Sequence, residues 1–288
     1  VSQTLAGRVA GVSMRPNGGG PGGDNPNIHI RGIVTTGNNA PLIVVDGIRR
    51  DNMNQVDPNS IDTITILKDA AAIAPFGIGG ANGVILITTK KGKTGKPTIT
   101  VSSSYAFQNP TYLPKMLNAR DYLALQNEGY FNLNPTGTTP PNDPAMVADY
   151  NNLHAQDPYR YPDSNFNSEL NRNFGIMMNN VEISGGSEAV KYRAGIGHYD
   201  QKGLFDPLGY KRYTYDLSID AQVTSTTKFG MSIRGSNERT DGLDGGTGVP
   251  GLMRSFYKFM PNRTLRYPEG DKWGEAAASS PVAVLESD

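Results

Sequence analysis

Two segments of the chain decide how its fold is interpreted: DPNSIDTITILKD at residues 57–69 and ANGVILITTKK at residues 81–91. The first opens with turn residues and continues as an alternating run, which predicts one tight turn followed by a strand with both faces largely covered. On that strand Ile61, Thr63, Thr65 and Leu67 are expected to share one face. The second segment contains VILIT at residues 84–88, a short apolar run typical of a buried strand.

The sequence around these segments predicts a small α+β domain. Short helices are expected at residues 3–10 and 69–73, the second ending before Pro75, and short strands at residues 12–14, 27–31 and 42–45. Asp46 and Gly47 follow the last of these strands and form a dipeptide typical of turns.

Aromatic content and charge both change near residue 96. Of the 14 Tyr, 9 Phe and 1 Trp in the chain, only Phe76 precedes that point. Residues 1–96 carry 10 Lys and Arg against 6 Asp, a net charge of +4, and the rest carries −4. Because the connector KKGKTGKP at residues 90–97 is rich in Gly and Lys, we predict a domain boundary there, with domains at residues 1–96 and 97–288.

The second domain is expected to contain five antiparallel strands separated by long loops. Alternation of apolar and polar side chains marks strands near residues 99–108, 177–184, 191–197, 213–221 and 228–234. One face is apolar, whereas the other carries small residues and the charged side chains of Lys191, Arg193, Asp216, Asp220 and Arg234.

Alternation alone leaves two interpretations of these strands open. A soluble antiparallel sheet would turn its polar face to water. The wall of a membrane β-barrel would turn its polar face to a wet lumen and its apolar face to lipid, with Tyr210, Tyr213 and Tyr215 in an interfacial girdle. The long segments at residues 110–172 and 241–288, with helices expected near residues 119–129 and 252–260, favour a barrel with long loops on one side.

Composition and motifs argue against several other kinds of site. The chain has no cysteine and a formal net charge of zero, which gives no reason to expect a thiolate site or a nucleic-acid partner. DGLDGG at residues 241–246 lacks the ligand spacing of a calcium loop, and His29, His154 and His198 are too dispersed to predict zinc. No set of nucleophile, base and orienting group is recognisable, so we expect no catalytic residues, no enzyme activity, no cofactor and no metal.

The order of several motifs resembles the SusC/RagA family of TonB-dependent outer-membrane transporters. The residues that carry the resemblance are LAGRVAGV (5–12), IHIRG (28–32), PLIVVDGI (41–48), LKDA (67–70), ANGVILITTKK (81–91), ISGG (183–186) and GHYDQKG (197–203). The resemblance implies a membrane β-barrel with an α+β plug domain, of which this chain covers the plug and about five antiparallel barrel strands. One departure is APFGIGG at residues 74–80, where the family usually has an arginine. Because five strands cannot close a barrel of about 22 strands, the sequence is expected to be part of a longer protein.

The resemblance also implies a function. It implies active import of a glycan or peptide through the outer membrane of a Gram-negative bacterium, with the plug gating the barrel. TonB would act on a segment upstream of residue 1, and a SusD-like surface lipoprotein would close over the barrel. Two alternatives remain open: an importer of an iron chelate or cobalamin that works without a lid, and a structural barrel protein of the envelope.

Two groups of candidate residues follow from the resemblance and from charge. The net positive plug is expected to complement carboxylates inside the barrel, with Arg31 contacting one of Asp216, Asp220 and Glu182. The plug motif residues are Asp46, Gly47, Lys68, Asp69, Asn82 and Gly83. For Asp46 with Gly47, and for Asp69 near a helix N-cap, a purely local role in the backbone remains the simpler interpretation.

Overall fold

A computed structural model describes residues 11–15, 20–23, 26–30, 32, 37–53, 56–168, 170, 174–206, 208–242 and 248–264. Within them the chain forms two compact units. The described residues of unit 1 fall within 1–108, 174–203 and 208–241, and those of unit 2 within 109–173, 204–207 and 242–264. The helix expected at residues 3–10 lies outside the described residues.

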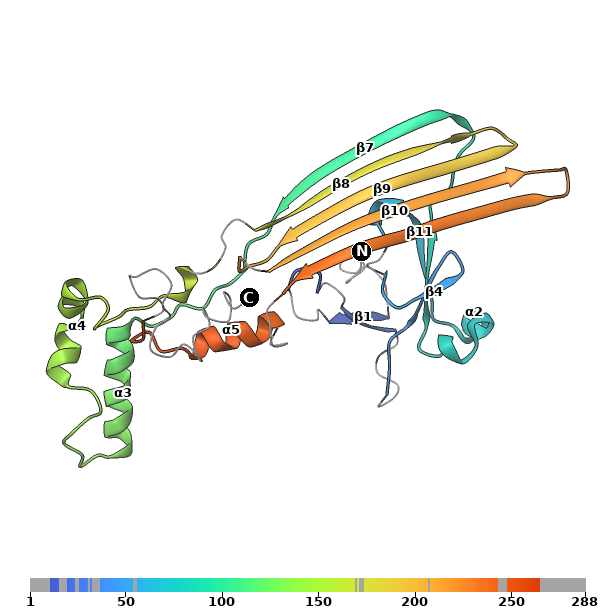
Figure 1. Cartoon of the computed structure of the whole chain (residues 1–288). Coiled ribbons are helices and arrows are strands. Elements are labelled where there is room, and N and C mark those ends of the chain that lie inside the picture. Colours follow the sequence, from blue (N-terminus) through green and yellow to red (C-terminus); the bar gives the residue numbers. More distant parts are fainter. Residues whose placement is uncertain are drawn as a thin grey trace. The chain divides into compact units, whose positions relative to one another are not determined.

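Unit 1 contains a small mixed sheet in the order β4-β3-β6-β5. Its strands are β3 (Leu42–Val45), β4 (Ile48–Arg50), β5 (Ile61–Leu67) and β6 (Val84–Thr89), and β3 runs parallel to β6 (Figure 1). Short β1 (Val12–Arg15) and β2 (Asn27–Ile30) pair separately with each other. A buried apolar core joins them, formed by Ile28, Ile30, Ile43, Val45, Met53, Val56, Ile85 and Ile87. The short apolar runs of the sequence therefore form strands that are buried on at least one face, as predicted.

The turn between β3 and β4 uses the predicted dipeptide. Asp46 has φ 45° and Gly47 has φ 87°. Two successive positive φ values are typical of a two-residue hairpin whose twist matches its strands, and Asp and Gly tolerate that conformation best. The local role expected for this pair is therefore present, and it also fixes where the Asp46 carboxylate points.

The face assignment within β5 was wrong. The register between β5 and β6 shifts between Ile61 and Thr63, which leaves Asp62 as an extra residue in β5. The bulge reverses the alternation, so Ile61 joins Ile64 and Ile66 against the core, whereas Thr63 and Thr65 are exposed. The strand thus has one covered face rather than two.

Short helical turns flank β5. The predicted turn at residues 57–60 is the 3-10 helix η2 (Pro58–Ser60). The predicted Ala-rich helix is α2 (Ala70–Ile73), with Asp69 at its N-cap. The chain does not leave helical structure before Pro75, because the 3-10 segment η3 (Ala74–Gly80) accepts proline in its first turn.

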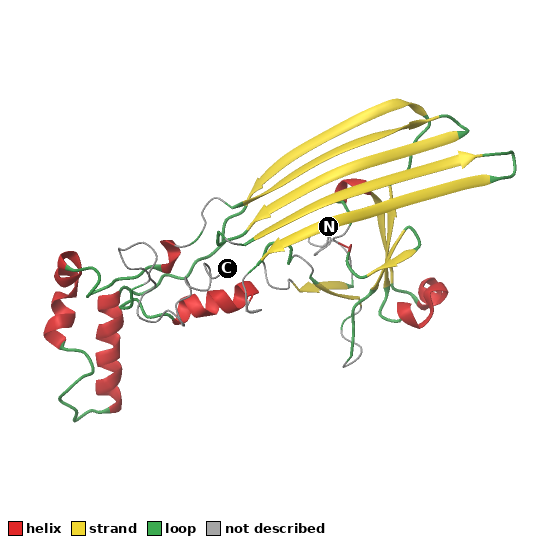
Figure 2. Ribbon diagram, viewed as in Figure 1, coloured by secondary structure: helices red, strands yellow, loops and turns green. Residues whose placement is uncertain are grey.

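The second sheet of unit 1 consists of five antiparallel strands in the order β11-β10-β9-β8-β7 (Figure 2). They are β7 (Gly95–Phe107), β8 (Gly175–Gly186), β9 (Val190–Lys202), β10 (Gly209–Gln222) and β11 (Lys228–Asp241). All five predicted strands are confirmed, and each is longer than the alternating run that predicted it. The order means that each strand pairs with its neighbours in the sequence, as in a meander.

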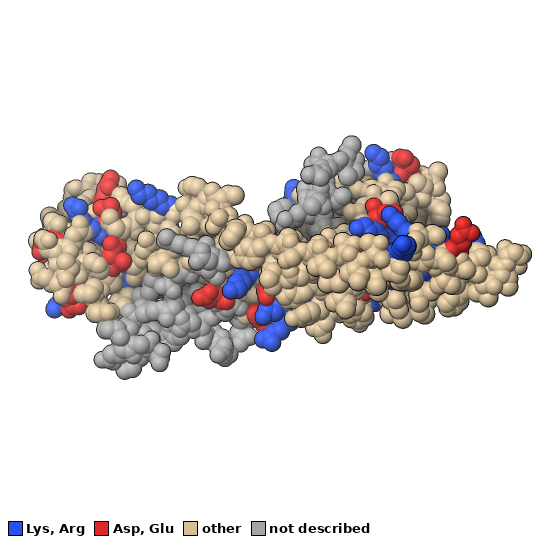
Figure 3. All heavy atoms as spheres, turned by 90° about the horizontal axis from the view of Figure 1, so that it is seen from above, with Lys and Arg blue, Asp and Glu red and all other residues tan. Residues whose placement is uncertain are grey.

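The two faces of this sheet are covered in an unusual way. Apolar side chains such as Val101 and Ile196 are 70% and 68% exposed, whereas Arg193 on the opposite face is 1% exposed. We call these the exposed face and the inner face. Over much of the sheet the exposed face carries few charges, which in Figure 3 gives a long tan surface. A sheet that buries its polar side and exposes its apolar side is the reverse of the usual arrangement in water.

The helices of unit 2 are α3 (Ala119–Leu133), α4 (Pro144–Gln156) and α5 (Gly248–Lys258). α3 and α5 were predicted, but α4 was missed, although Asp143 caps it through a hydrogen bond from Ala145 N and Pro144 occupies its first turn. Ala119, Leu123, Val147 and Tyr150 form a small buried cluster between α3 and α4. Among the residues that the structure describes, no helix combines the length and the apolar character needed to cross a membrane.

Candidate functional site

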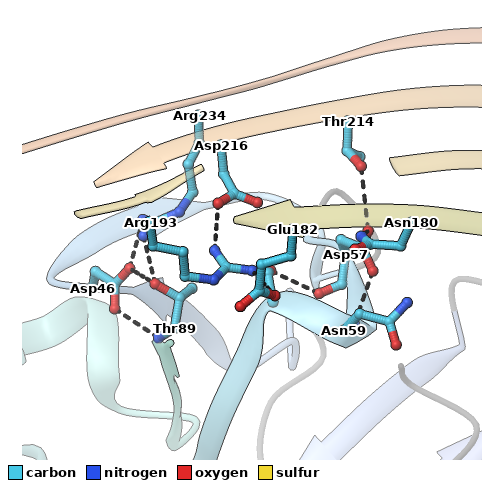
Figure 4. Close-up of polar contacts among 11 residues, drawn as sticks. Asp46, Asp57, Asn59, Thr89, Asn180, Glu182, Arg193, Thr214, Asp216 and Arg234 are labelled. Carbon is cyan, nitrogen blue, oxygen red and sulfur yellow. Dashed lines mark hydrogen bonds and ion pairs between the residues drawn. The ribbon is translucent and has the colours of Figure 1, made fainter. Parts of the chain in front are cut away.

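The polar contacts of unit 1 concentrate where the small sheet meets the inner face of the five-stranded sheet (Figure 4). The first contact joins Asp46, Thr89 and Arg234. Asp46 accepts hydrogen bonds from Thr89 N at 2.9 Å and from Thr89 Oγ1 at 2.7 Å. Arg234 Nη1 lies 2.5 Å from Asp46 Oδ2, and Arg234 Nη2 donates to Thr89 Oγ1 at 2.5 Å. The hydroxyl therefore donates to the carboxylate while it accepts from the guanidinium, and this closes a three-residue ring.

The elements that carry this ring explain its precision. The β3–β4 turn holds Asp46 beside the end of β6, where Thr89 is the last strand residue and is 2% exposed. Arg234 projects from β11 on the inner face, and its side chain is 17% exposed. A charged pair with so little access to water gains from each additional hydrogen bond, which Thr89 supplies.

A second contact places the carboxylate of Asp57 against the inner face of the five-stranded sheet. Its Oδ1 accepts from Asn59 N at 2.8 Å and so caps η2. Its Oδ2 accepts from Asn180 Nδ2 at 2.7 Å, with Thr214 Oγ1 at 3.5 Å. A Cβ added at Gly197 would overlap both Asp57 Oδ2 and Thr214 Oγ1. Glycine at this position therefore leaves the space that the carboxylate occupies.

A third cluster lies within the five-stranded sheet itself. Arg193 of β9 donates to Glu182 of β8 at 2.9 Å and also to Asp216 of β10. The arginine side chain is 1% exposed, so both carboxylates offset the cost of burying its charge. A Cβ at Gly195 would lie 2.8 Å from Asp216 Oδ1, so a larger residue there would displace the pair.

A small cleft with both polar and apolar lining lies between the two sheets. The small sheet and its connections contribute Val45, Arg50, Val56, Asp57 and Ser60, and the large sheet contributes Thr214, Tyr215, Asp216, Arg234, Gly235 and Ser236. Within the described part of the chain, no three His, Asp or Glu side chains converge as a metal site would require. The arrangement is suited to holding two parts of one chain together through polar groups.

The structure describes three of the four predicted contact residues, Glu182, Asp216 and Asp220. Arg31 lies outside the described residues. Glu182 and Asp216 do come together, but around Arg193 of their own sheet. Asp220 lies 3.9 Å from Lys91 in an exposed pair. In the buried ion pair between the two sheets, the small sheet and its turns provide the acid, Asp46, and the large sheet provides the base, Arg234.

The other plug motif residues mostly shape the backbone. Lys68 follows β5 directly, and Asp69 is the N-cap of α2. Asn82 Nδ2 donates to Asn38 O at 2.8 Å and so ties the start of β6 to the segment before β3. Gly83 has φ 92°, and a Cβ there would lie 2.8 Å from the Ile30 side chain.

Sequence reasoning missed Asp57, Thr89 and Asn180 as contact residues. Asp57 was interpreted only as part of a turn, and no local pattern distinguished Thr89 from its neighbours. The parity of the strands did give a usable signal, since Asn180, Glu182, Arg193, Thr214, Asp216 and Arg234 all occupy the polar face that alternation predicts.

Comparison with known proteins matches this fold to one family. The family model described as the TonB-dependent receptor plug domain matches residues 1–84. TonB-dependent receptor P39 of Formosa agariphila is 35% identical over 289 residues, which cover 99% of this chain and 26% of that protein. TonB-dependent receptor SusC of Bacteroides thetaiotaomicron is 30% identical over 86% of this chain and 24% of its own length. A chain in the structure of the RagAB peptide importer in the 'closed-closed' state superposes with a TM-score of 0.68 at 26% identity.

The chain belongs to the SusC/RagA-like TonB-dependent receptors. It spans about a quarter of the length of the curated relatives that it matches. The superposition on the RagAB structure covers 83% of this chain and 29% of the RagAB chain. The small sheet with its connections is therefore plug, and the five-stranded sheet is part of the barrel of a SusC/RagA-like receptor. The three polar clusters then lie between plug and barrel wall or within that wall.

Proposed function

We propose that the protein imports a nutrient, a glycan or a peptide, across the outer membrane of a Gram-negative bacterium, with the plug as a TonB-operated gate. One observation carries this proposal: the plug is held against the inner face of the barrel by charged and polar side chains, whereas the apolar face is turned outward. The boundary between plug and barrel is proposed at residue 96, next to the start of β7.

Polar contacts suit a gate because water can replace them. The net contribution of a protein hydrogen bond is about 1 kcal/mol, since water compensates most of what is lost when the bond opens. An apolar interface of the same area would have to expose its surface to water during each transport cycle. These contacts therefore hold the plug in one position, while an external force can still displace it at a moderate cost in free energy. They are the ring of Asp46, Thr89 and Arg234 and the Asp57 contact.

The proposed partners follow from the relatives. One relative is named SusC, and the matched structure is that of a peptide importer, RagAB. We propose that TonB acts on a segment on the plug side of this chain, and that a SusD-like surface lipoprotein closes over the barrel. These partners would place the protein among importers that take up glycans or peptides.

The first part of the test is a growth comparison. A strain lacking the gene is grown on glycan digests, on peptide digests, under iron limitation and under cobalamin limitation. We expect loss of growth on one glycan or peptide source, with the same loss in a strain lacking TonB. A defect confined to iron or cobalamin limitation would support the alternative importer, and unchanged growth in all media would support a structural role.

The second part tests the gate directly in whole cells. The chain has no cysteine, so Ser218→Cys introduces a unique thiol in it on the inner face, where Ser218 is 4% exposed. We expect a maleimide to label this thiol during uptake of the identified nutrient and not in cells lacking TonB. The control is Val223→Cys, because Val223 lies in a turn and is 63% exposed. It should be labelled in cells with and without TonB. Equal labelling of Ser218→Cys with and without TonB would refute plug movement.

A further inference from the structure

The exposed face of the barrel sheet changes character along its strands. The strand register groups its side chains into rows that cross all or most of the sheet. Four successive rows, counted from the short turns, carry no charged side chain. They are Val190, Ala221 and Phe229; then Gly185, Tyr192, Ile219 and Met231; then Ile99, Ile183, Ala194, Leu217 and Ile233; then Val101, Val181, Ile196, Tyr215 and Gly235. We call these four rows the apolar band.

The next two rows toward the strands' other ends are polar. The first is Ser103, Asn179, His198, Tyr213 and Asn237, and the second is Tyr105, Met177, Asp200, Lys211 and Arg239. Their polar groups are engaged along the sheet: Ser103 Oγ donates to Asn179 Oδ1 at 2.7 Å, and Lys211 Nζ lies 4.0 Å from Asp200. We call these two rows the polar belt.

The apolar band is a property of one face and not of that stretch of chain. At the same height on the inner face, between the third and fourth rows, one row contains Glu182, Gly195, Asp216 and Arg234. Charged residues are therefore abundant at this depth but excluded from the exposed side. Water on that side would give no reason for such exclusion, whereas hydrocarbon would, because charged side chains facing lipid are most costly near the middle of the bilayer.

We propose that the hydrocarbon of the outer membrane covers only the apolar band, and that the polar belt lies at headgroup level and beyond. This proposal rests on the proposed function, since it requires the barrel to lie in the outer membrane. Rows are two residues, about 6.8 Å, apart along an antiparallel strand, so four rows occupy about 27 Å of strand. At a strand tilt of about 40° this corresponds to a layer of about 20 Å, close to the apolar band of about 25 Å that such barrels present.

One consequence concerns the connections between the strands. The strands continue past the apolar band through the polar belt to Phe107, Lys202 and Asp241. The connections that follow β7, β9 and β11 therefore leave the barrel outside the hydrocarbon. His198 and Tyr213, whose ring centroids are 4.8 Å apart, mark the boundary between band and belt.

Spin labels on single cysteines test this boundary in the receptor reconstituted in a phospholipid bilayer. Labels replace Leu217, Tyr215, Tyr213 and Lys211 in turn, four outward positions of β10 that descend from the band into the belt. Accessibility to oxygen and to a water-soluble nickel chelate gives the depth of each label. We expect the label at 217 to lie deepest in the hydrocarbon and the label at 215 to lie at an intermediate depth. The label at 213 should have a depth near zero, at the hydrocarbon boundary, and the label at 211 should lie in water. Labels at Ala194, Ile196, His198 and Asp200 of β9 should repeat the series.

Each outcome separates the two proposals. Labels at 213 and 211 as deep as that at 217 would overturn the proposed boundary while leaving the barrel in the membrane. An aqueous label at 217 would overturn the outer-membrane barrel itself, and with it the proposed function. A gradual change of depth with its zero crossing between 215 and 211, repeated in β9, would support the boundary.

Discussion

The plug sheet and the barrel sheet both carry many apolar side chains on their strands, yet these side chains are buried in the first and exposed in the second. In the plug, Ile85 and Ile87 of β6 are fully buried in an apolar core. In the barrel sheet, Ile196 is 68% exposed and Arg193, three residues earlier on the other face, is 1% exposed. Period-2 alternation thus specifies two faces but not which one is buried. What surrounds the sheet decides that, and the proposed arrangement, with a plug on one side and lipid on the other, reverses the usual choice.

Removing the arginine from the barrel wall is expected to have the largest effect. Arg193→Met leaves Glu182 and Asp216 buried together without their counter-charge, which costs about 3–5 kcal/mol of folding free energy. The measurement is the urea concentration at which the detergent-solubilised receptor loses its folded mobility on a gel. Adding Glu182→Gln and Asp216→Asn to this variant should restore most of the loss. An unchanged midpoint for Arg193→Met alone would show that the inner face does not depend on this charge.

The same apolar truncation should have unequal effects in the two sheets. Ile85→Ala opens a cavity in the plug core and is expected to cost about 2–5 kcal/mol. Ile196→Ala should cost well under half of that, because lipid chains can fill the space that it leaves. Hydrogen exchange at the amides of β6 reports the first and gel mobility in urea the second. Equal losses at both positions would mean that the exposed face is packed against protein.

The strands themselves could be predicted from sequence because their period is local. Each of the five barrel strands showed an alternating run before any contact was known, and VILIT was recognisably a buried strand. The bulge at Asp62 was not predictable, because it depends on pairing with β6 rather than on the residues of β5. α4 was missed because its Asp-Pro start lies in a Pro-rich loop, where it resembles further turn signals.

The contacts between plug and wall were harder to predict than the fold. Asp46 and Arg234 are far apart in the sequence, and their meeting depends on the turn that aims Asp46 and on the register that places Arg234 inside. Charge arithmetic suggested a positive plug inside an acidic barrel. The wall instead neutralises two of those carboxylates with its own Arg193, and the third, Asp220, lies in an exposed pair with Lys91. The buried ion pair between wall and plug has the opposite polarity, with Arg234 on the wall and Asp46 on the plug.

The ring at Asp46 tests whether charge holds the plug. Asp46→Asn keeps the shape but removes the charge that pairs with Arg234, so we expect a loss of about 1–3 kcal/mol in plug seating. The readout is the urea concentration at which Ser218→Cys becomes reactive to a maleimide. Asp51→Asn, at an exposed position of the plug, is the matched control and should leave that concentration unchanged. A similar shift in both variants would point to net plug charge rather than to the ring.

The smallest effect is expected where a polar group is buried in the ordinary way. In unit 2, Tyr150 is 4% exposed and donates its hydroxyl proton to Pro162 O at 2.9 Å. Tyr150→Phe keeps the ring and leaves one carbonyl unsatisfied, so we expect a loss of about 1 kcal/mol at neutral pH. The measurement is a urea titration of the receptor followed by its helical circular dichroism.

The same residue predicts a pH dependence with a definite sign. Burial, and then the negative charge of Asp163, raises the pKa of Tyr150 to about 12 from its usual 10.0. Between these values an unfolded Tyr150 has lost its proton while the folded one keeps it, so the free energy of unfolding falls as the pH rises from 10 to 12. Tyr150→Phe cannot titrate, so its stability should fall less steeply over this range. If the free energy of unfolding falls equally steeply with pH in the two proteins, water reaches the Tyr150 hydroxyl. This buried tyrosine would then titrate like the exposed tyrosines of the barrel sheet.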